Sequence, residues 1–232
     1  MLEAAQVQNI LVDHHQTQFI PEHQKIGMLD SGAFRALRAS SRISLPNYLS
    51  KVENFTERAE LIVAPDVIND PQTTFENYKL VRQMPTLKNK LVPVWQWNAS
   101  FDYLQQYLNE AEIVGIGGLA KIFHDESNET AKALREETLE LLLYLCQKFP
   151  HRFHIFGLNY LKAIQLLAPF AFSADSSVWL RGARYGYLIF QHSKTQNLTQ
   201  APARNLPFSR HFNRQQRCIA NAKNIENFLF NH

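Results

Sequence analysis

Short apolar runs recur along this chain, and most of them end at a polar side chain or a glycine. The runs are continuously apolar, which is typical of parallel strands that are covered on both faces. Segments with helical periodicity separate them. Such an alternation predicts an α/β fold, and about eight units favour a (β/α)8 barrel of the TIM type over an open sheet. The predicted strands lie at 9–13, 25–29, 61–65, 91–95, 112–116, 153–156, 166–172 and 187–190.

Helix signals fill most of the intervals between these strands. Asp70 and Pro71 form an N-cap and a first-turn proline, and Ser100 can cap the helix that contains Phe101. The predicted helices cover 46–60, 70–84, the segment after Ser100, 128–149 and 160–167, and a basic amphipathic helix is expected at 213–230.

Polar residues stand where the predicted strands end. Asp30, Asp66 and Asp175 each follow an apolar run, and Gln96 follows another. In a TIM barrel the active site lies at the carboxyl ends of the strands, so we expect these side chains to converge there. Three acids without a cluster of Cys or His indicate acid/base or carboxylate-nucleophile chemistry without a metal. Such chemistry suits attack at a sugar anomeric carbon.

Two further local patterns bear on ligands. His14 and His15 follow the predicted strand at 9–13. As consecutive residues of an extended segment their side chains should point to opposite faces, and no metal site is expected. Arg181 and Arg184 follow Asp175 closely enough to hold an anion beside it. Helix N-caps are the structural alternative for each acid at a strand end.

Charge and cysteine content limit the classes of function. Residues 181–232 carry a net charge of +7 and the preceding residues carry −4, which suggests a polyanionic partner. Cys146 and Cys218 are too few for a disulfide framework or a four-cysteine zinc site. We expect a cytoplasmic protein without a signal peptide, a membrane span or a cofactor.

The predicted domains are a catalytic barrel at 1–190 and a basic extension at 191–232 that packs on it.

Several segments together resemble the tRNA-guanine transglycosylases and their DNA-modifying relatives. The segments are Asp30-Ser-Gly-Ala-Phe34, Asp66, Gln96 after Val92-Pro-Val-Trp, Ile116-Gly-Gly-Leu119, Ile155-Phe-Gly-Leu158, Ala174-Asp-Ser-Ser177 and Leu180-Arg-Gly-Ala-Arg184-Tyr-Gly. They follow the family's order between about residues 25 and 190. Ala33 and Arg35 depart from the family's glycine and glutamine, and the family's C-terminal zinc subdomain is lacking.

This resemblance implies a (β/α)8 enzyme that exchanges guanine in nucleic acid for a 7-deazaguanine such as preQ0. By that comparison Asp175 would be the covalent nucleophile and Asp30 the general acid/base. Ser31, Asp66, Gln96, Gly117, Gly118 and Leu119 would bind the base, and Arg181 and Arg184 would bind flanking phosphates. The absent zinc subdomain favours DNA over tRNA as substrate. The alternatives are tRNA exchange, hydrolysis of a free nucleoside, and a nucleic-acid-binding barrel without catalysis.

Overall fold

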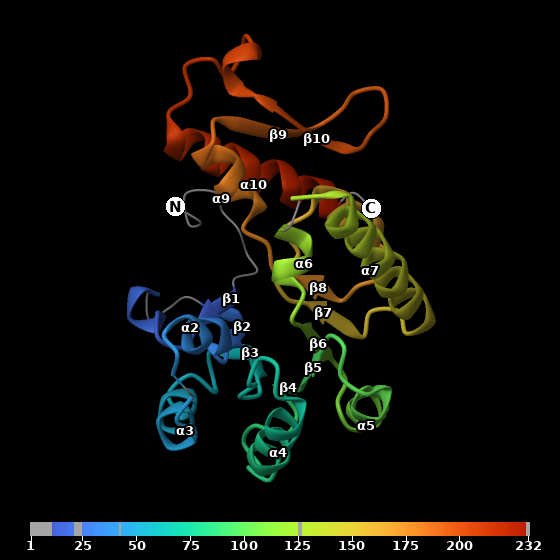
Figure 1. Ribbon diagram of the computed structural model, residues 1–232. Coiled ribbons are helices and arrows are strands. Elements are labelled where there is room, and N and C mark those ends of the chain that lie inside the picture. Colours follow the sequence, from blue (N-terminus) through green and yellow to red (C-terminus); the bar gives the residue numbers. More distant parts are fainter. Residues whose placement is uncertain (1–10, 21–24, 42, 125–126, 231–232) are drawn as a thin grey trace. The chain divides into compact units, whose positions relative to one another are not determined.

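A computed structural model describes residues 11–20, 25–41, 43–124 and 127–230 (Figure 1). It has a mixed α/β fold with parallel sheets. The strands are β1 (Leu11–Asp13), β2 (Ile26–Asp30), β3 (Ala59–Val63), β4 (Leu91–Val92), β5 (Val94–Gln96), β6 (Val114–Gly117), β7 (Phe153–Ile155), β8 (Ser173–Ala174), β9 (Tyr187–Gln191) and β10 (Leu198–Pro202). The α-helices are α2 (Ala33–Arg38), α3 (Leu45–Glu53), α4 (Pro71–Arg82), α5 (Phe101–Glu110), α6 (Ala120–His124), α7 (Glu129–Lys148), α8 (Leu161–Leu167), α9 (Val178–Arg184) and α10 (Arg214–Phe230). None of these helices combines the length and apolar character needed to cross a bilayer.

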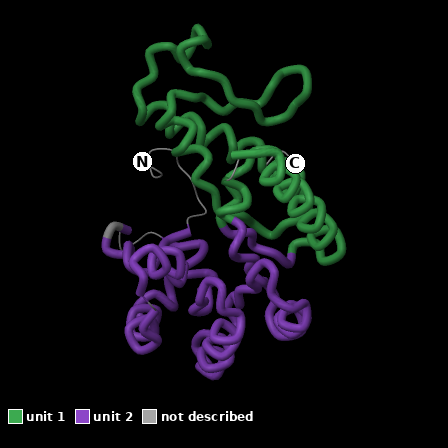
Figure 2. Tube along the Cα trace, in the orientation of Figure 1, with its two compact units in different colours: residues 1–8, 120–151, 157–232 green, residues 9–119, 152–156 purple. Residues whose placement is uncertain are grey.

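The chain divides into two compact units (Figure 2). The N-terminal unit runs to residue 119 and also includes 152–156. The C-terminal unit comprises 120–151 and 157 onward. Strands β1 to β7 belong to the N-terminal unit, whereas α6 to α10 belong to the C-terminal unit.

The N-terminal unit is built on parallel strands in chain order. β1, β2, β3 and β4 pair in sequence, with Met28 opposite Leu11 on one side and Leu61 on the other. β5, β6 and β7 continue in the same way. Pro93, which has no N–H to donate, separates β4 from β5, but its carbonyl accepts a hydrogen bond from Gly115 N at 2.8 Å. The segment 91–96 therefore joins the two parallel sheets.

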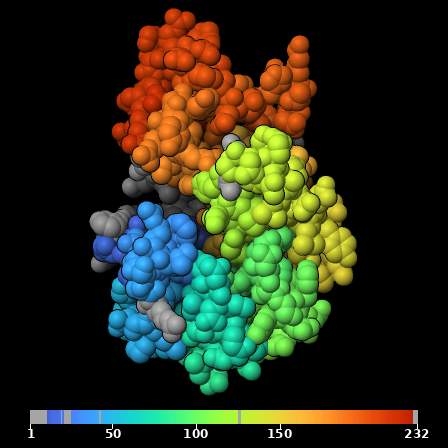
Figure 3. Space-filling model, in the orientation of Figure 1, coloured from blue at the N-terminus to red at the C-terminus, as the bar shows by residue number. Residues whose placement is uncertain are grey.

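Apolar side chains on this sheet form the core of the N-terminal unit. Met28, Val63, Val92, Val94 and Ile113 are buried together, with Leu11, Leu61 and Phe156 packed against them. Gly115 is needed here, because a Cβ at this position would lie 2.4 Å from the Phe156 ring. The outer sides of α4 and α5 lie on the surface of the unit (Figure 3).

The predicted helix starts are confirmed. The side chains of Asp70, Ser100 and Asn128 accept hydrogen bonds from backbone N–H groups in the first turns of α4, α5 and α7. These caps satisfy N–H groups that a helix cannot satisfy internally.

Two strand predictions need correction. Residues 166–172 do not form a strand: α8 extends to Leu167, and a turn leads to the two-residue strand β8. Residues 187–190 do form a strand, but β9 is antiparallel to β10, with Ile189 opposite Gln200, and so does not extend the parallel set. A closed eight-stranded ladder is not found in the described part of the chain, and the barrel remains a prediction.

The basic extension folds within the C-terminal unit. α10 packs against α9 and β9. Asn221 on α10 is fully buried, and its side chain accepts from Ile189 N at 2.7 Å and donates to the carbonyl of Trp179 at 3.0 Å. The turn between β9 and β10 projects as a narrow arm (Figure 3). Buried hydrogen bonds, rather than apolar contact alone, therefore attach the extension.

Arg152 should be a main stabiliser of the N-terminal unit. Its guanidinium donates to the carbonyls of Leu108, Ala111 and Glu112 at 2.8, 2.7 and 2.5 Å, beside the C-terminus of α5. Arg152→Met should lower the free energy of unfolding by about 2–3 kcal/mol, because charged donors are lost from a helix C-terminus. Urea unfolding followed by circular dichroism measures this change. The control is Arg82→Met, which removes an ion pair to Glu110 at the surface and should cost below about 1 kcal/mol. Equal effects of the two variants would contradict this role.

Candidate functional site

Three of the predicted base-binding residues meet in the N-terminal unit. Ser31 Oγ donates to Asp66 Oδ1 at 2.6 Å, and Gln96 Nε2 donates to Asp66 Oδ2 at 3.3 Å. All three side chains are buried, with exposed fractions of 0%, 8% and 4% respectively. Ser31 and Asp66 follow β2 and β3, which pair in parallel, and Gln96 is the last residue of β5, which continues the chain from β4 after Pro93. Of the residues expected to converge at the strand ends, Asp66 and Gln96 are in contact, and the convergence of Asp175 with them stays a prediction.

Gln96 holds this cluster together. Its Oε1 accepts from Asn69 N at 2.9 Å while its Nε2 donates to Asp66. An amide nitrogen carries two hydrogens, so one donor is left for a ligand. In this arrangement Gln96 positions the Asp66 carboxyl group, and its role in binding a base stays a prediction.

The glycine loop lies beside Gln96. Gly117 is opposite Gln96 in the β5–β6 register, and its carbonyl accepts from Trp97 N at 2.9 Å. Gly118 is exposed and has a φ of +84°, a conformation that favours glycine. Leu119 is fully buried, so its side chain supports the loop and is not available to a ligand.

The surroundings of the Asp66 carboxyl group change its pKa. Burial raises its pKa to about 6, and the hydrogen bond from Ser31 partly opposes this shift. Asp66 is therefore mainly a carboxylate at neutral pH and gains a proton in mildly acidic solution. A buried carboxylate that offers acceptors at the end of a strand can bind two N–H groups of a planar base edge.

Asp30 adjoins this cluster through the chain. It is the last residue of β2, it is half-buried, and its Oδ2 accepts from Gly32 N at 3.3 Å. It lines a cavity of about 540 Å³ together with Phe34, Arg35 and Arg38. The carboxyl group of Asp30 is therefore placed where a ligand can reach it.

Asp175 is held in the C-terminal unit. Its Oδ1 accepts from Gly157 N at 2.7 Å, and its carbonyl accepts from Leu158 N at 2.9 Å. Gly157 has a φ of +70°, and a Cβ there would lie 2.9 Å from that of Ala120. Asp175 is half-buried and follows β8 directly. Asp30 and Asp175 belong to different units, and their apposition remains a prediction.

The two arginines after Asp175 have different environments. Arg181 Nη1 lies 2.7 Å from His124 Nδ1, and its Nη2 donates to the carbonyl of Asn159 at 3.4 Å. Arg184 is exposed, with its guanidinium carbon 5.9 Å from the centroid of the Tyr185 ring. Arg181 is thus held in a network, whereas Arg184 is open to solvent.

Asn159 organises that network and was not found from the sequence. It is buried, its Oδ1 accepts from Ser177 N at 2.7 Å and from Ser177 Oγ at 2.9 Å, and its Nδ2 lies 3.1 Å from His124 Nε2. Gly157, which ends the 153–156 run, was the nearest sequence signal. No spacing rule connects an asparagine at 159 with a histidine at 124.

The predicted geometry of the histidine pair is wrong. β1 ends at Asp13, so His14 and His15 lie in a turn and not on a strand. Their ring centroids are 3.8 Å apart, and ligand atoms of Asp13, His14 and His15 lie within 4.8 Å of one another. Arg35 Nε donates to Asp13 Oδ2 at 2.7 Å. This positive charge opposes a metal cation, although the donor set itself could hold one.

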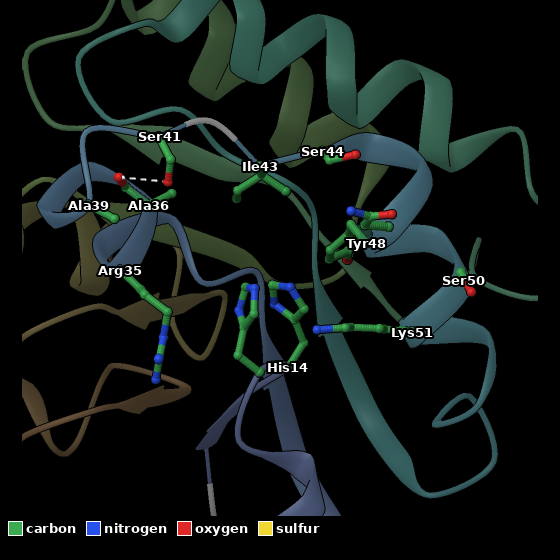
Figure 4. A pocket seen from close by; sticks show the side chains of 12 residues that line it. His14, Arg35, Ala36, Ala39, Ser41, Ile43, Ser44, Tyr48, Ser50 and Lys51 are labelled. Carbon is green, nitrogen blue, oxygen red and sulfur yellow. Dashed lines mark hydrogen bonds between the residues drawn. The ribbon is translucent and has the colours of Figure 1, made fainter.

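Both histidines line a second cavity, of about 360 Å³, between the end of β1 and helices α2 and α3 (Figure 4). Arg35 lines this cavity as well as the one beside Asp30.

No family model matches the chain, and no curated protein sequence matches it. The resemblance to the transglycosylases therefore rests on the ordered sequence motifs alone and stays a prediction.

Asp66 should make stability depend on pH. Because its folded pKa is higher than that of an unfolded aspartate, ionisation opposes folding, and stability falls as pH rises from about 4 to 6. Asp66→Asn removes this penalty and should raise the free energy of unfolding by up to about 3 kcal/mol at pH 7, with no gain at pH 4. Urea unfolding at pH 4, 5, 6 and 7 measures the difference. Asp102→Asn, at an exposed position on α5, is the control and should give parallel curves. Parallel curves for Asp66→Asn as well would contradict the raised pKa.

Proposed function

We propose that this protein exchanges guanine in nucleic acid, with DNA preferred over tRNA, for a 7-deazaguanine such as preQ0. The observation that carries the proposal is the buried Asp66 carboxylate, fixed by Ser31 and Gln96 at the strand edge that also holds Asp30 and Gly118. Guanine presents adjacent N–H donors on its Watson–Crick edge, and a fixed carboxylate accepts two of them. The exposed Gly118 backbone offers a surface on which a flat base can lie.

The strand arrangement supports a barrel as the framework of this reaction. Parallel strands in chain order, from β1 to β7, are the arrangement that a (β/α)8 barrel uses. In the complete barrel, the carboxyl end of β8 would bring Asp175 to the edge that carries Asp30. This apposition belongs to the proposal.

The chemistry then requires two steps. The target nucleotide is turned out of its stack. The Asp175 carboxylate attacks C1′, the bond from C1′ to N9 breaks, and Asp30 gives a proton to the departing guanine. The incoming 7-deazaguanine gives its N9 proton to Asp30 and attacks C1′, which releases Asp175 from the ester. One glycosidic bond replaces another, so no redox cofactor or ATP is consumed.

The remaining charge supports a nucleic-acid substrate. Arg184 is exposed next to Tyr185, and its guanidinium would contact phosphates. Cys146 and Cys218 are both free and buried, which fits the reducing conditions of a cytoplasmic protein.

Incorporation of radiolabelled preQ0 tests the proposal. The protein is incubated separately with duplex DNA, tRNA and free guanosine. Label should enter DNA. Label in tRNA alone would transfer the proposal to tRNA, and release of guanine from guanosine without an acceptor would indicate a hydrolase. If none of the three substrates reacts, the remaining alternative is a nucleic-acid-binding protein without catalysis.

Substitutions of Asp175 and Asp30 should distinguish the nucleophile from the general acid/base. Asp175→Asn should lower incorporation by at least about 1,000-fold and abolish a protein–DNA adduct on denaturing gels, because the nucleophile is lost. Asp30→Asn should lower incorporation by about 100- to 10,000-fold, the usual contribution of a general acid/base. Asp102→Asn is the matched control and should retain activity. An adduct that persists in Asp175→Asn would overturn the assignment of the nucleophile.

A further inference from the structure

The cavity between the end of β1 and helices α2 and α3 has a lining that is rich in nitrogen groups. Arg35, Lys51, His14 and His15 line it, and none of its described lining residues is acidic (Figure 4). Ser44 and Asn47, from the start of α3, add a hydroxyl and an amide. A cavity with this lining is suited to a negatively charged ligand.

Lys51 is the most informative of these residues. It is half-buried, and its side chain extends from α3 toward His14 (Figure 4). In the described part of the chain its ammonium group has no hydrogen-bond or ion-pair partner. An ammonium group without a partner in the protein is available to pair with a bound anion.

Arg35 contributes a second cation. Only its Nε is used, in the bond to Asp13, so its two terminal amino groups have no hydrogen-bond partner among the described residues. Asp13 also accepts from His15 Nδ1 at 3.1 Å, so this one carboxylate is hydrogen-bonded to both the Arg35 guanidinium and the His15 ring. The charge of Arg35 is therefore offset by Asp13, and Lys51 leaves the described lining residues with a net positive charge.

His14 forms the buried wall of the cavity. Its exposed fraction is 3%, its Nδ1 lies 3.3 Å from the carbonyl of Asp30, and its Nε2 has no hydrogen-bond partner in the described residues. Burial, and then the neighbouring His15, lower its pKa to about 4, with a further contribution from Lys51. His14 is therefore neutral at pH 7, and the cavity's cations are Arg35 and Lys51.

The start of α3 adds a weaker attraction. Ser44 is its N-cap, but the Ser44 side chain makes no capping hydrogen bond. Backbone N–H groups at a helix N-terminus attract anions.

From this geometry we propose that the cavity binds a phosphate group. A guanidinium fork, an ammonium, a hydroxyl and an amide together supply donors on several sides, as a tetrahedral anion with several oxygens requires. The cavity, at about 360 Å³, is larger than a phosphate alone and leaves room for an attached sugar. The phosphate belongs either to a nucleic-acid backbone or to a free phosphorylated small molecule. The nucleic-acid alternative rests on the proposed function, in which Asp30 is the general acid/base. The His14 ring, which lines the cavity, contacts the main chain of Asp30.

Binding measurements on the full chain test this proposal. Isothermal titration calorimetry at low ionic strength uses inorganic phosphate and then 5′-dGMP, and fluorescence anisotropy uses a labelled single-stranded DNA. Lys51→Met and Arg35→Met should each weaken the binding of phosphate and of dGMP by about tenfold or more. Lys88→Met, at an exposed position of the same unit, is the matched control and should bind as the wild type does. Lys51→Gln, with a thermal melt for each variant, separates loss of binding from loss of fold.

The DNA measurements identify the source of the phosphate. If the site holds a backbone phosphate, Lys51→Met should weaken DNA binding and reduce the slope of log Kd against log salt by about 1. If DNA binding is unchanged while dGMP binding falls, the ligand is a free phosphorylated molecule. Phosphate and dGMP binding in Lys51→Met equal to that of Lys88→Met would overturn the proposal. Incorporation of preQ0 is scored separately, so loss of the exchange function leaves this result interpretable.

Discussion

Parallel pairing in chain order is the constraint on which the N-terminal unit depends. It places the ends of β2, β3, β5 and β6 at one edge, although these ends are separated by tens of residues in the sequence. Pro93 interrupts the strand between β4 and β5 without breaking this order, because its carbonyl still accepts from Gly115 N. The polar cluster around Asp66 exists only because the register is kept, since a slip of one residue would turn its side chains to the other face.

The same cluster shows how a site can cost stability. A buried carboxylate is unfavourable, and the raised pKa of Asp66 expresses this cost. The hydroxyl of Ser31 and the amide of Gln96 offset part of it by donating to both oxygens. A neutral side chain of the same shape would serve the fold better. A carboxylate at such an unfavourable position fits a role in binding, which is the basis of the functional proposal.

The sequence predicted local features well and long-range ones unevenly. The N-caps at Asp70 and Ser100 depend on neighbouring backbone groups alone, so they could be recognised from the sequence. The run at 166–172 is as apolar as a buried strand, but its first two residues belong to α8. Periodicity cannot distinguish a strand from a buried helix in so short a segment. The turn that brings the rings of His14 and His15 together depends on where β1 ends, and the hub at Asn159 depends on contacts distant in sequence. Neither leaves a pattern in the sequence.

The cavity and the predicted acid/base share one piece of backbone. His14 Nδ1 contacts the carbonyl of Asp30, and a Cβ on Gly32 would lie 3.0 Å from the His14 ring. Gly32 also adopts a φ of +78° and donates to the Asp30 carboxylate. The turn after β2 is thus fixed by the imidazole on one side and by the carboxylate on the other. A ligand that holds His14 in place therefore also restricts the orientation of Asp30, and so binding in the cavity and acid/base chemistry at β2 would be coupled through a single glycine.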